Sequence, residues 1–249
     1  MRRAFHRADP ETPQPPKEVL DYLRRKGVRP AWNWFDVWKQ EHLAAFTVAG
    51  VMEKDILADV QASIDQALEA GLPFAGFKKL VTPILADKGW LGRRDSIDPI
   101  TGEIKEVELG TPQRLKIIFK TNVDMARAAG QWEKIKSTEA ALPYLEYRHG
   151  TSRVPRPDHL KFDGLILPID DPFWKTNYPP NAFGCTCFTR QISAWEAKRK
   201  GGVSASPELK MVEWRNKKTG EVLLVPEGCA PGFDFNVGIE RLKGIRSAE

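Results

Sequence analysis

The sequence predicts an α+β protein with a helical N-terminal part, a compact mixed region and a C-terminal β-hairpin. Before about residue 137, apolar residues recur at helical spacing over long segments. After it, short apolar segments are broken by proline and glycine. Gly-containing turns near 95–109 and at 211–225 predict two hairpins. Long helices followed by short strands favour the α+β class.

The composition is that of a folded globular protein. Hydrophobic residues make up 41% of the 249, charged residues 29%, and 8 tryptophans argue against general disorder. The longest apolar run, "LAAFTVAGVM" at 43–52, is too short for a membrane-spanning helix. A net charge of +5 permits contact with a polyanion but is mild for a dedicated nucleic-acid binder. Because no apolar run is long enough to cross a bilayer, no membrane partner is expected.

The chain is expected to have three parts: an arm at 1–16, a mainly helical region at 17–136 and a mixed region at 137–249. Four prolines precede Lys17, and no apolar segment follows the N-terminal arginines, so the start resembles a flexible arm rather than a secretory signal. Three cysteines, an odd number, do not make a disulfide framework. Free thiols in a reducing compartment are the expected state.

The helical region is predicted from three segments. Residues 53–70 carry apolar side chains at helical spacing, with Gly71 just past the last turn. The next segment contains Pro83, which must either kink a helix or begin a new one. A third helix opens near Pro112. Between these segments and the arm lies an aromatic group that offers packing surface to a core or a partner: Trp32, Trp34, Phe35 and Trp38.

A proline-rich stretch in the mixed region, "DDPFWKTNYPPNAFG" at 170–184, predicts a braced structural loop. Pro179 and Pro180 restrict its backbone, and Asp163-Gly164 predicts a turn before it. Large aromatic side chains are expected to be buried to keep this loop ordered. They are Phe173, Trp174, Tyr178 and Phe183.

One histidine and a Cys-x-Cys pair lie in the same region and suggest a structural zinc site. His159, Cys185 and Cys187 are ligand types that a tetrahedral zinc ion accepts. A closed structural site needs a fourth ligand, and the spacing does not select one. The candidates are Asp163, His149 and Cys229.

The same residues allow a rival hypothesis, a small metal-dependent hydrolase or nuclease centred on His159, Asp163, Cys185 and Cys187. His159 could act as a general base oriented by an aspartate, or Cys185 as a nucleophile. The sequence contains no His-Glu-x-x-His, Gly-x-Ser-x-Gly, phosphate-binding or dinucleotide motif. These absences favour a protein that is not an enzyme.

A basic run at Lys198, Arg199 and Lys200 supports a third hypothesis, contact with DNA phosphates or with an acidic protein surface. Binding to DNA through such residues would weaken steeply as salt rises.

Several segments, in order along the chain, resemble the phage Mu F-like minor head proteins of the phage head-morphogenesis family. They are "FDVWKQEHLAAFTVA", "GWLGRRDSIDPITGE", "LGTPQRLKIIFKTNVDMARAAGQW", "LPYLEYRHG", "RPDHLKFDGLILPIDDPFWKTNYPPNAFGCTC" and the closing "PGFDFNVG". The resemblance runs from about Lys17 to Gly238. The family's His…Cys-x-Cys pattern falls on His159, Cys185 and Cys187.

The resemblance implies a minor capsid protein of a tailed phage or prophage, without a known catalytic cycle. Its implied partners are the portal and capsid proteins, and packaged phage DNA is a further candidate. The implied location is the head interior of the virion, after synthesis in the host cytoplasm. Related head proteins can carry an additional Cys-x-x-Cys, whereas the equivalent region here reads "RPDHLKFDG", so a four-thiolate zinc site is absent.

Overall fold

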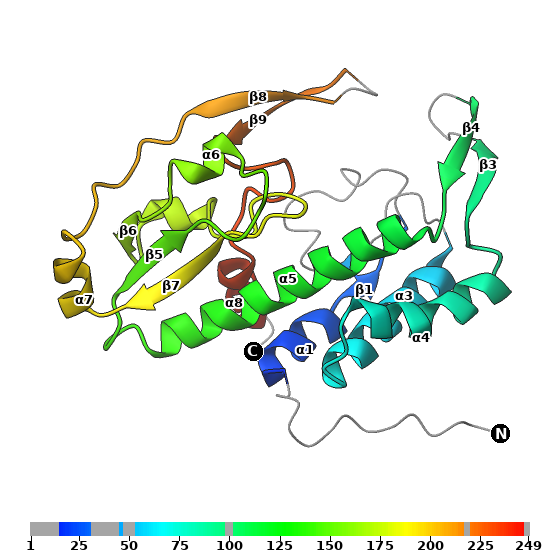
Figure 1. Ribbon diagram of the computed structural model, residues 1–249, viewed down its shortest axis with the longest axis horizontal. Helices are drawn as coiled ribbons and strands as arrows, with labels where there is room; N and C mark the ends of the chain where they lie inside the picture. The colour runs from blue at the N-terminus through cyan, green and yellow to red at the C-terminus, as the bar shows by residue number, and fades with distance from the viewer. Residues whose placement is uncertain (1–14, 31–44, 47–52, 98–101, 217–219, 247–249) are drawn as a thin grey trace. The chain divides into compact units, whose positions relative to one another are not determined.

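A computed structural model describes residues 15–30, 45–46, 53–97, 102–216 and 220–246 (Figure 1). They form two compact units, with described residues 15–126 in the first and 127–246 in the second. The boundary falls inside a long helix, α5, Pro112–Ser137. The α+β class predicted from the sequence is confirmed. Most of the predicted N-terminal arm and the aromatic group around Trp34 lie outside the described residues.

Helices dominate the first unit. They are α1, Lys17–Arg24; α3, Lys54–Glu69; α4, Phe74–Asp87; and the first part of α5. Helix α3 forms where the apolar periodicity predicts it, and its buried side chains follow that spacing: Ile56, Leu57, Val60, Ile64, Ala67 and Leu68. Phe77 of α4 stacks on Phe119 of α5 with ring centroids 4.9 Å apart.

Helix α4 continues through Pro83 as one element instead of starting anew there. Proline has no backbone N–H to donate, so one hydrogen bond of the helix is lost at this point. Thr82 Oγ1 donates to the carbonyl of Lys78 at 2.7 Å one turn earlier. On the helix's buried face, Phe77, Val81 and Leu85 keep it packed.

Two short sheets complete the first unit. Strands β1, Gly27–Val28, and β2, Ala45–Phe46, pair in parallel. Strands β3, Arg93–Ile97, and β4, Ile104–Glu108, pair antiparallel as the hairpin that the sequence predicts near 95–109. Gly102, with φ of 72°, lies in the connection, where a left-handed backbone favours glycine.

A three-stranded antiparallel sheet with the order β6-β5-β7 lies at the centre of the second unit (Figure 1). Its strands are β5, Tyr144–Arg148; β6, Ile166–Pro168; and β7, Phe188–Ile192. The central strand β5 buries three consecutive residues, Leu145, Glu146 and Tyr147. Consecutive residues of a strand point to opposite faces, so both faces of β5 are covered.

Short elements surround this sheet. They are α6, Pro157–Leu160; the 3-10 helix η1, Pro172–Lys175; α7, Ala194–Arg199; the hairpin strands β8, Met211–Arg215, and β9, Val222–Pro226; and α8, Val237–Arg246. The hairpin β8–β9 is the one predicted at 211–225, and Gly220 with φ of 75° lies in its connection. No helix among the described residues has the length and apolar character needed to span a bilayer.

Polar side chains attach the C-terminal part of α5 to β7. Gln191 donates to the carbonyls of Leu142 and Ile135 at 2.8 and 3.0 Å. Gln131 donates to the carbonyl of Thr189 at 3.1 Å. Trp132 packs edge-on against Tyr178 at 4.9 Å between ring centroids. The helix thus supports the strand that follows the two cysteines.

The proline-rich loop is braced largely as predicted, with one correction. Phe173, Trp174 and Tyr178 are at most 2% exposed. Phe183 was expected to be buried with them, but 38% of it is exposed, so that expectation is wrong. Its ring makes a T-shaped contact with Phe233 at 4.8 Å between centroids, and part of the side chain remains exposed.

Candidate functional site

His159 lies in the short helix α6 and points its Nδ1 atom at two cysteines. Pro157 stands at the start of that helix, a position where its missing N–H costs nothing. The imidazole is 4% exposed, and Nδ1 lies 3.6 Å from Cys185 Sγ and 3.5 Å from Cys187 Sγ. The three donor atoms all lie within 4.8 Å of one another.

The two cysteines come from the segment that leads directly into β7. In extended backbone, residues two apart point to the same side, so both thiols can face His159. Gly150 makes this placement possible, because a Cβ atom there would lie 1.8 Å from the carbonyl oxygen of Thr186. Any larger residue at 150 would push the segment between the two thiols away.

The two thiols hold their protons very differently. The hydrogen bond from Cys185 is the largest influence on Cys187 and, despite burial, lowers the pKa of Cys187 to about 6. Tyr147 and the backbone of Gly150 also lower it by hydrogen bonding. That same hydrogen bond, together with burial, raises the pKa of Cys185 to about 12. Of the two, Cys187 is therefore the thiol that loses its proton more readily.

Tyr147 links this group to the third cysteine. Its hydroxyl, buried on β5, lies 3.2 Å from Asn181 Oδ1. Asn181 Nδ2 in turn donates to Cys229 Sγ at 3.8 Å, and the Cys229 thiol donates to the carbonyl of Thr176 at 3.4 Å. Cys229 is thus occupied by Asn181 and Thr176, and burial raises its pKa to about 12.

The distances from His159 Nδ1 to the two sulfur atoms fit a zinc ion. With Zn–S of about 2.3 Å and Zn–N of about 2.0–2.1 Å, tetrahedral angles require an N···S separation of about 3.6 Å. The two observed separations are 3.5 and 3.6 Å. Nitrogen and thiolate sulfur are also the donor types that zinc prefers. His159, Cys185 and Cys187 would supply three of four ligands.

Two of the three candidates for a fourth ligand, Asp163 and Cys229, have other partners. The third, His149, contacts Asp163 through its backbone N–H. The Asp163 carboxylate accepts the backbone N–H of His149 at 2.7 Å and pairs with Arg148 Nε at 3.2 Å. Cys229 bonds to Asn181 and Thr176. Of the candidates named from the sequence, the fold brings together His159, Cys185 and Cys187.

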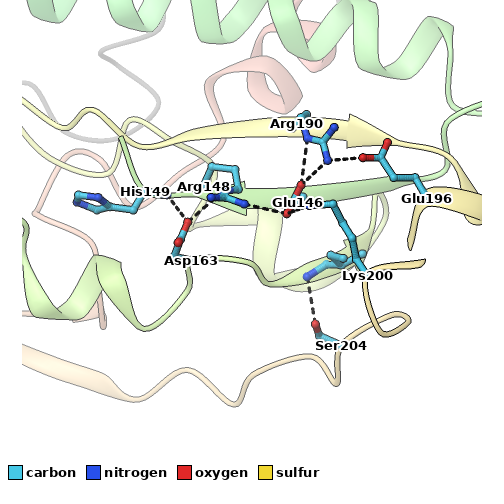
Figure 2. Close-up of polar contacts among 9 residues, drawn as sticks. Glu146, Arg148, His149, Asp163, Arg190, Glu196, Lys200 and Ser204 are labelled. Carbon is cyan, nitrogen blue, oxygen red and sulfur yellow. Dashed lines mark hydrogen bonds and ion pairs between the residues drawn. The ribbon is translucent and has the colours of Figure 1, made fainter. Parts of the chain in front are cut away.

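A second polar group, the ion-pair cluster, lies on the same sheet (Figure 2). At its centre is Glu146 of β5, whose side chain is 2% exposed. The cluster consists of three acidic and three basic residues: Glu146, Asp163, Glu196, Arg148, Arg190 and Lys200. Burial raises the pKa of Glu146, but hydrogen bonds from Lys200, Arg190 and Arg148 outweigh it and hold the pKa below its ordinary value.

The basic run predicted as a contact surface is split by this cluster. Lys200 Nζ donates to Glu146 at 2.7 Å. Arg199 lies over the ring of Trp195, with the guanidinium carbon 4.6 Å from the centroid. Lys198 is exposed near the end of α7. Lys198 and Arg199 thus remain at the surface, whereas Lys200 joins α7 to the sheet.

The residues named for the structural loop hold backbone turns. Gly164 has φ of 84° and donates its N–H to the carbonyl of Tyr147 at 2.8 Å. Trp174 donates Nε1–H to the carbonyl of Pro168 at 2.9 Å. The peptide bond between Pro179 and Pro180 is cis.

Several residues that support the candidate site or the ion-pair cluster were not evident from the sequence. Glu146, Tyr147 and Gly150 all occur in "LPYLEYRHG", which reads as an ordinary strand followed by a turn. A charged residue between two apolar ones suggests an exposed side chain, yet Glu146 is buried. Its three cationic partners lie 2, 44 and 54 residues away, so no local pattern could have identified the set.

Comparison with known proteins gives consistent matches. The family described as "Phage Mu protein F like protein" matches residues 58–190. The putative capsid assembly protein F of Escherichia phage Mu is 33% identical over 213 residues, which are 84% of this chain and 48% of that protein. The Mu-like prophage FluMu F protein of Haemophilus influenzae is 32% identical over 222 residues, 83% of this chain and 52% of that protein. The chain spans about half the length of these relatives, and no solved structure matches it.

Proposed function

Because the chain belongs to the Phage Mu protein F like family, we propose that it is a structural component in the assembly of a phage head. The observation that carries this proposal is the family match over residues 58–190, together with a relative named as a putative capsid assembly protein. The matched stretch contains His159, Cys185 and Cys187. The residues that build the candidate site therefore lie within the segment that matches the family.

The proposed setting is the head of a tailed phage or prophage, with synthesis in the host cytoplasm. The proposed partners are the portal and capsid proteins, and DNA inside the head is a further one. Lys198 and Arg199 of α7 are the residues assigned to phosphate contact, since both are exposed. Lys200 belongs to the fold, because it pairs with Glu146.

The role is proposed to be non-enzymatic. A hydrolase centred on His159 would use Asp163 to orient or assist it. Asp163 instead pairs with Arg148 and accepts the N–H of His149. His159 Nδ1 faces two sulfur atoms in a region where the imidazole is 4% exposed. This arrangement suits a structural metal site that holds the loops around the sheet in place.

We propose that His159, Cys185 and Cys187 hold a structural zinc ion. When bound, zinc would join α6 to the segment before β7, in addition to the hydrogen bond from Arg156 to the carbonyl of Phe183. Both thiols would lose their protons on binding zinc, and the lowered pKa of Cys187 makes this easier for that residue. Hydrogen bonds from the Tyr147 side chain and the Gly150 backbone would position Cys187.

Metal analysis of purified variants tests the zinc proposal and the hydrolase hypothesis together. His159→Ala and Cys187→Ser are expected to lose zinc and thermal stability together, because zinc-binding energy is folding energy. Cys229→Ala is the matched control, a buried cysteine outside the donor group, and it should keep zinc. Zinc retained at wild-type level in Cys187→Ser would refute the proposed structural zinc site. A hydrolytic activity lost in a folded His159→Ala variant would favour the enzyme instead.

Head assembly is tested by removing the protein from its phage or prophage and supplying it in trans. Loss of the protein is expected to reduce the yield of DNA-filled heads seen by electron microscopy, and the complementing chain should co-sediment with heads. Normal heads that never contain the chain would contradict the role.

DNA contact is tested by titrating the chain with duplex DNA at about 50 and 200 mM salt. Lys198→Gln with Arg199→Gln should weaken binding and reduce its salt dependence. Lys175→Gln, on η1, is a control for general charge loss. Equal affinity in both variants, or affinity that does not depend on salt, would remove DNA from the partners.

A further inference from the structure

The hairpin β8–β9 leaves one strand edge open for pairing. Glu227 donates its N–H to Lys210 and Asn216 donates to Glu221, each at 2.8 Å, which fixes the hydrogen-bonding phase of the ladder. Residues 212, 214 and 216 therefore bond toward β9. The N–H and C=O groups of Met211, Glu213 and Arg215 point to the outer side of β8. Within the described residues this sheet has only two strands, so that side has no third strand.

The two edges of the hairpin are not equivalent. On β9 the outward-pointing residues are Val222, Leu224 and Pro226. Proline has no N–H, so this edge lacks one of its donors and is a poor template for another strand. On β8 each outward residue can both donate and accept. A further strand is therefore expected to pair with the β8 edge and not with the β9 edge.

Several exposed side chains of the hairpin are apolar. Met211, Val222 and Leu224 share one face and are 55%, 42% and 60% exposed. On the opposite face Val212 is 42% exposed and Trp214 is half-buried. An open edge flanked by exposed apolar side chains is the type of strand that associates unless it is protected by charge.

The charges on β8 are arranged so that they match a second copy of the same strand. Glu213 and Arg215 are exposed, lie two residues apart and therefore point to the same face. We propose that β8 pairs antiparallel with β8 of a second copy of this chain, about a two-fold axis at Trp214. Glu213 of each copy then lies directly opposite Arg215 of the other, and the two hairpins form one four-stranded sheet.

Other registers of the same edge are disfavoured by charge. Shifting the two-fold axis to residue 213 places Glu213 opposite Glu213, and shifting it to residue 215 places Arg215 opposite Arg215. A parallel in-register pairing places like charges side by side at both positions. Directly opposed like charges destabilise a strand pair, whereas opposite charges stabilise it. The register about Trp214 forms two favourable pairs instead.

The same register pairs the two tryptophans. Because residue 214 bonds toward β9, it occupies a non-hydrogen-bonded position in the new pairing, where opposed Cα atoms approach to about 4.5 Å. Trp214 of one copy would meet Trp214 of the other there, and opposed aromatic side chains are among the favourable cross-strand pairs. Residues 213 and 215 would form the backbone hydrogen bonds on either side.

Charge reversal tests this pairing without depending on the head-assembly role. The full chain is expected to dimerise in sedimentation experiments as its concentration rises. Glu213→Arg or Arg215→Glu alone creates two like-charge pairs and should raise the dimer dissociation constant at least about tenfold. An equimolar mixture of the two single variants restores both opposite-charge pairs, so it should form heterodimers at about wild-type affinity. The double variant E213R/R215E should also recover.

Glu208→Arg is the matched control, since it makes the same charge change at an exposed residue outside the strand. It should leave the dissociation constant within about twofold. Circular dichroism of each variant confirms that the fold is retained. A wild-type chain that stays monomeric up to submillimolar concentration overturns the proposal and assigns the edge to a different strand. A dimer dissociation constant that is unchanged by both single charge reversals overturns it as well. So does a failure of the mixed single variants to recover wild-type affinity.

Discussion

Lys200 Nζ lies 2.7 Å from an oxygen of Glu146, a carboxylate that is 2% exposed in the middle strand of the sheet. The two residues are 54 positions apart, and their contact fixes the end of α7 against β5. Arg190 binds the other carboxylate oxygen at 2.9 Å, and Arg148 donates to the first at 3.2 Å. A buried negative charge is thus compensated by cations from β5, β7 and the end of α7.

Replacement of Glu146 by Gln should destabilise the second unit. Removing one member of a fully buried pair costs about 3–5 kcal/mol. The cations here are 34–43% exposed and can be hydrated when released, so we expect a smaller loss of about 1–3 kcal/mol. Urea denaturation measures it. Glu139→Gln, in an exposed pair with Lys136, is the control and should change the free energy of unfolding by less than about 0.5 kcal/mol.

The Glu146 contribution should also depend on pH. Its pKa in the folded chain lies below the ordinary value, so the stabilisation is complete above about pH 5 and is lost as pH falls through the folded pKa. The difference in unfolding free energy between wild type and Glu146→Gln should therefore be constant from about pH 7 to 5 and shrink below about pH 4. Denaturation at a series of pH values measures this difference. A gap that remained constant down to about pH 3 would contradict the role of the ionised carboxylate.

Gly150→Ala should disrupt the thiol segment. The added methyl would lie 1.8 Å from the Thr186 carbonyl oxygen, so Thr186 must move and carry its two neighbours with it. We expect a loss of about 1–3 kcal/mol in stability and weaker zinc retention during dialysis against a chelator.

Gly184→Ala is the comparison for this variant. Gly184 has φ of 68°, but no atom lies within 4 Å of the added methyl, so the cost should be limited to backbone strain of about 1 kcal/mol. Its zinc retention should match wild type. Equal zinc loss in both variants would show that the contact with Thr186 is not the cause.

Asn236 provides a test of how the C-terminal segment is attached. Its Oδ1 accepts the N–H groups of Gly238 and Ile239 at the start of α8, and its Nδ2 donates to the carbonyl of Trp174 at 2.9 Å. Asn236→Ala removes both a helix cap and a tie to η1, so we expect a loss of about 2–3 kcal/mol in denaturation.

Ser193→Ala removes a cap alone, because Ser193 Oγ accepts the N–H of Glu196 at the start of α7. It should cost about 1 kcal/mol. If Asn236→Ala costs no more than Ser193→Ala, the contact with Trp174 contributes nothing to stability.

Much of the architecture follows from local sequence. Helix α3 appears where apolar residues recur at helical spacing, and both hairpins appear where the sequence has a Gly-containing turn. Periodicity and turn chemistry act over a few residues, so they can be read without knowing the fold. The sequence also identified His159, Cys185 and Cys187 as candidate ligands from their residue types.

The tertiary structure decided which of these residues meet and which do not. Asp163 lies only four residues from His159 in the chain, yet it pairs with Arg148, whereas the two cysteines, 26 and 28 residues away, face the imidazole. Glu146 is buried because strands and a helix bring three cations to it, and Phe183 stays 38% exposed although its ring contacts Phe233. Contacts between distant segments depend on how whole elements pack, and no short stretch of sequence contains that information.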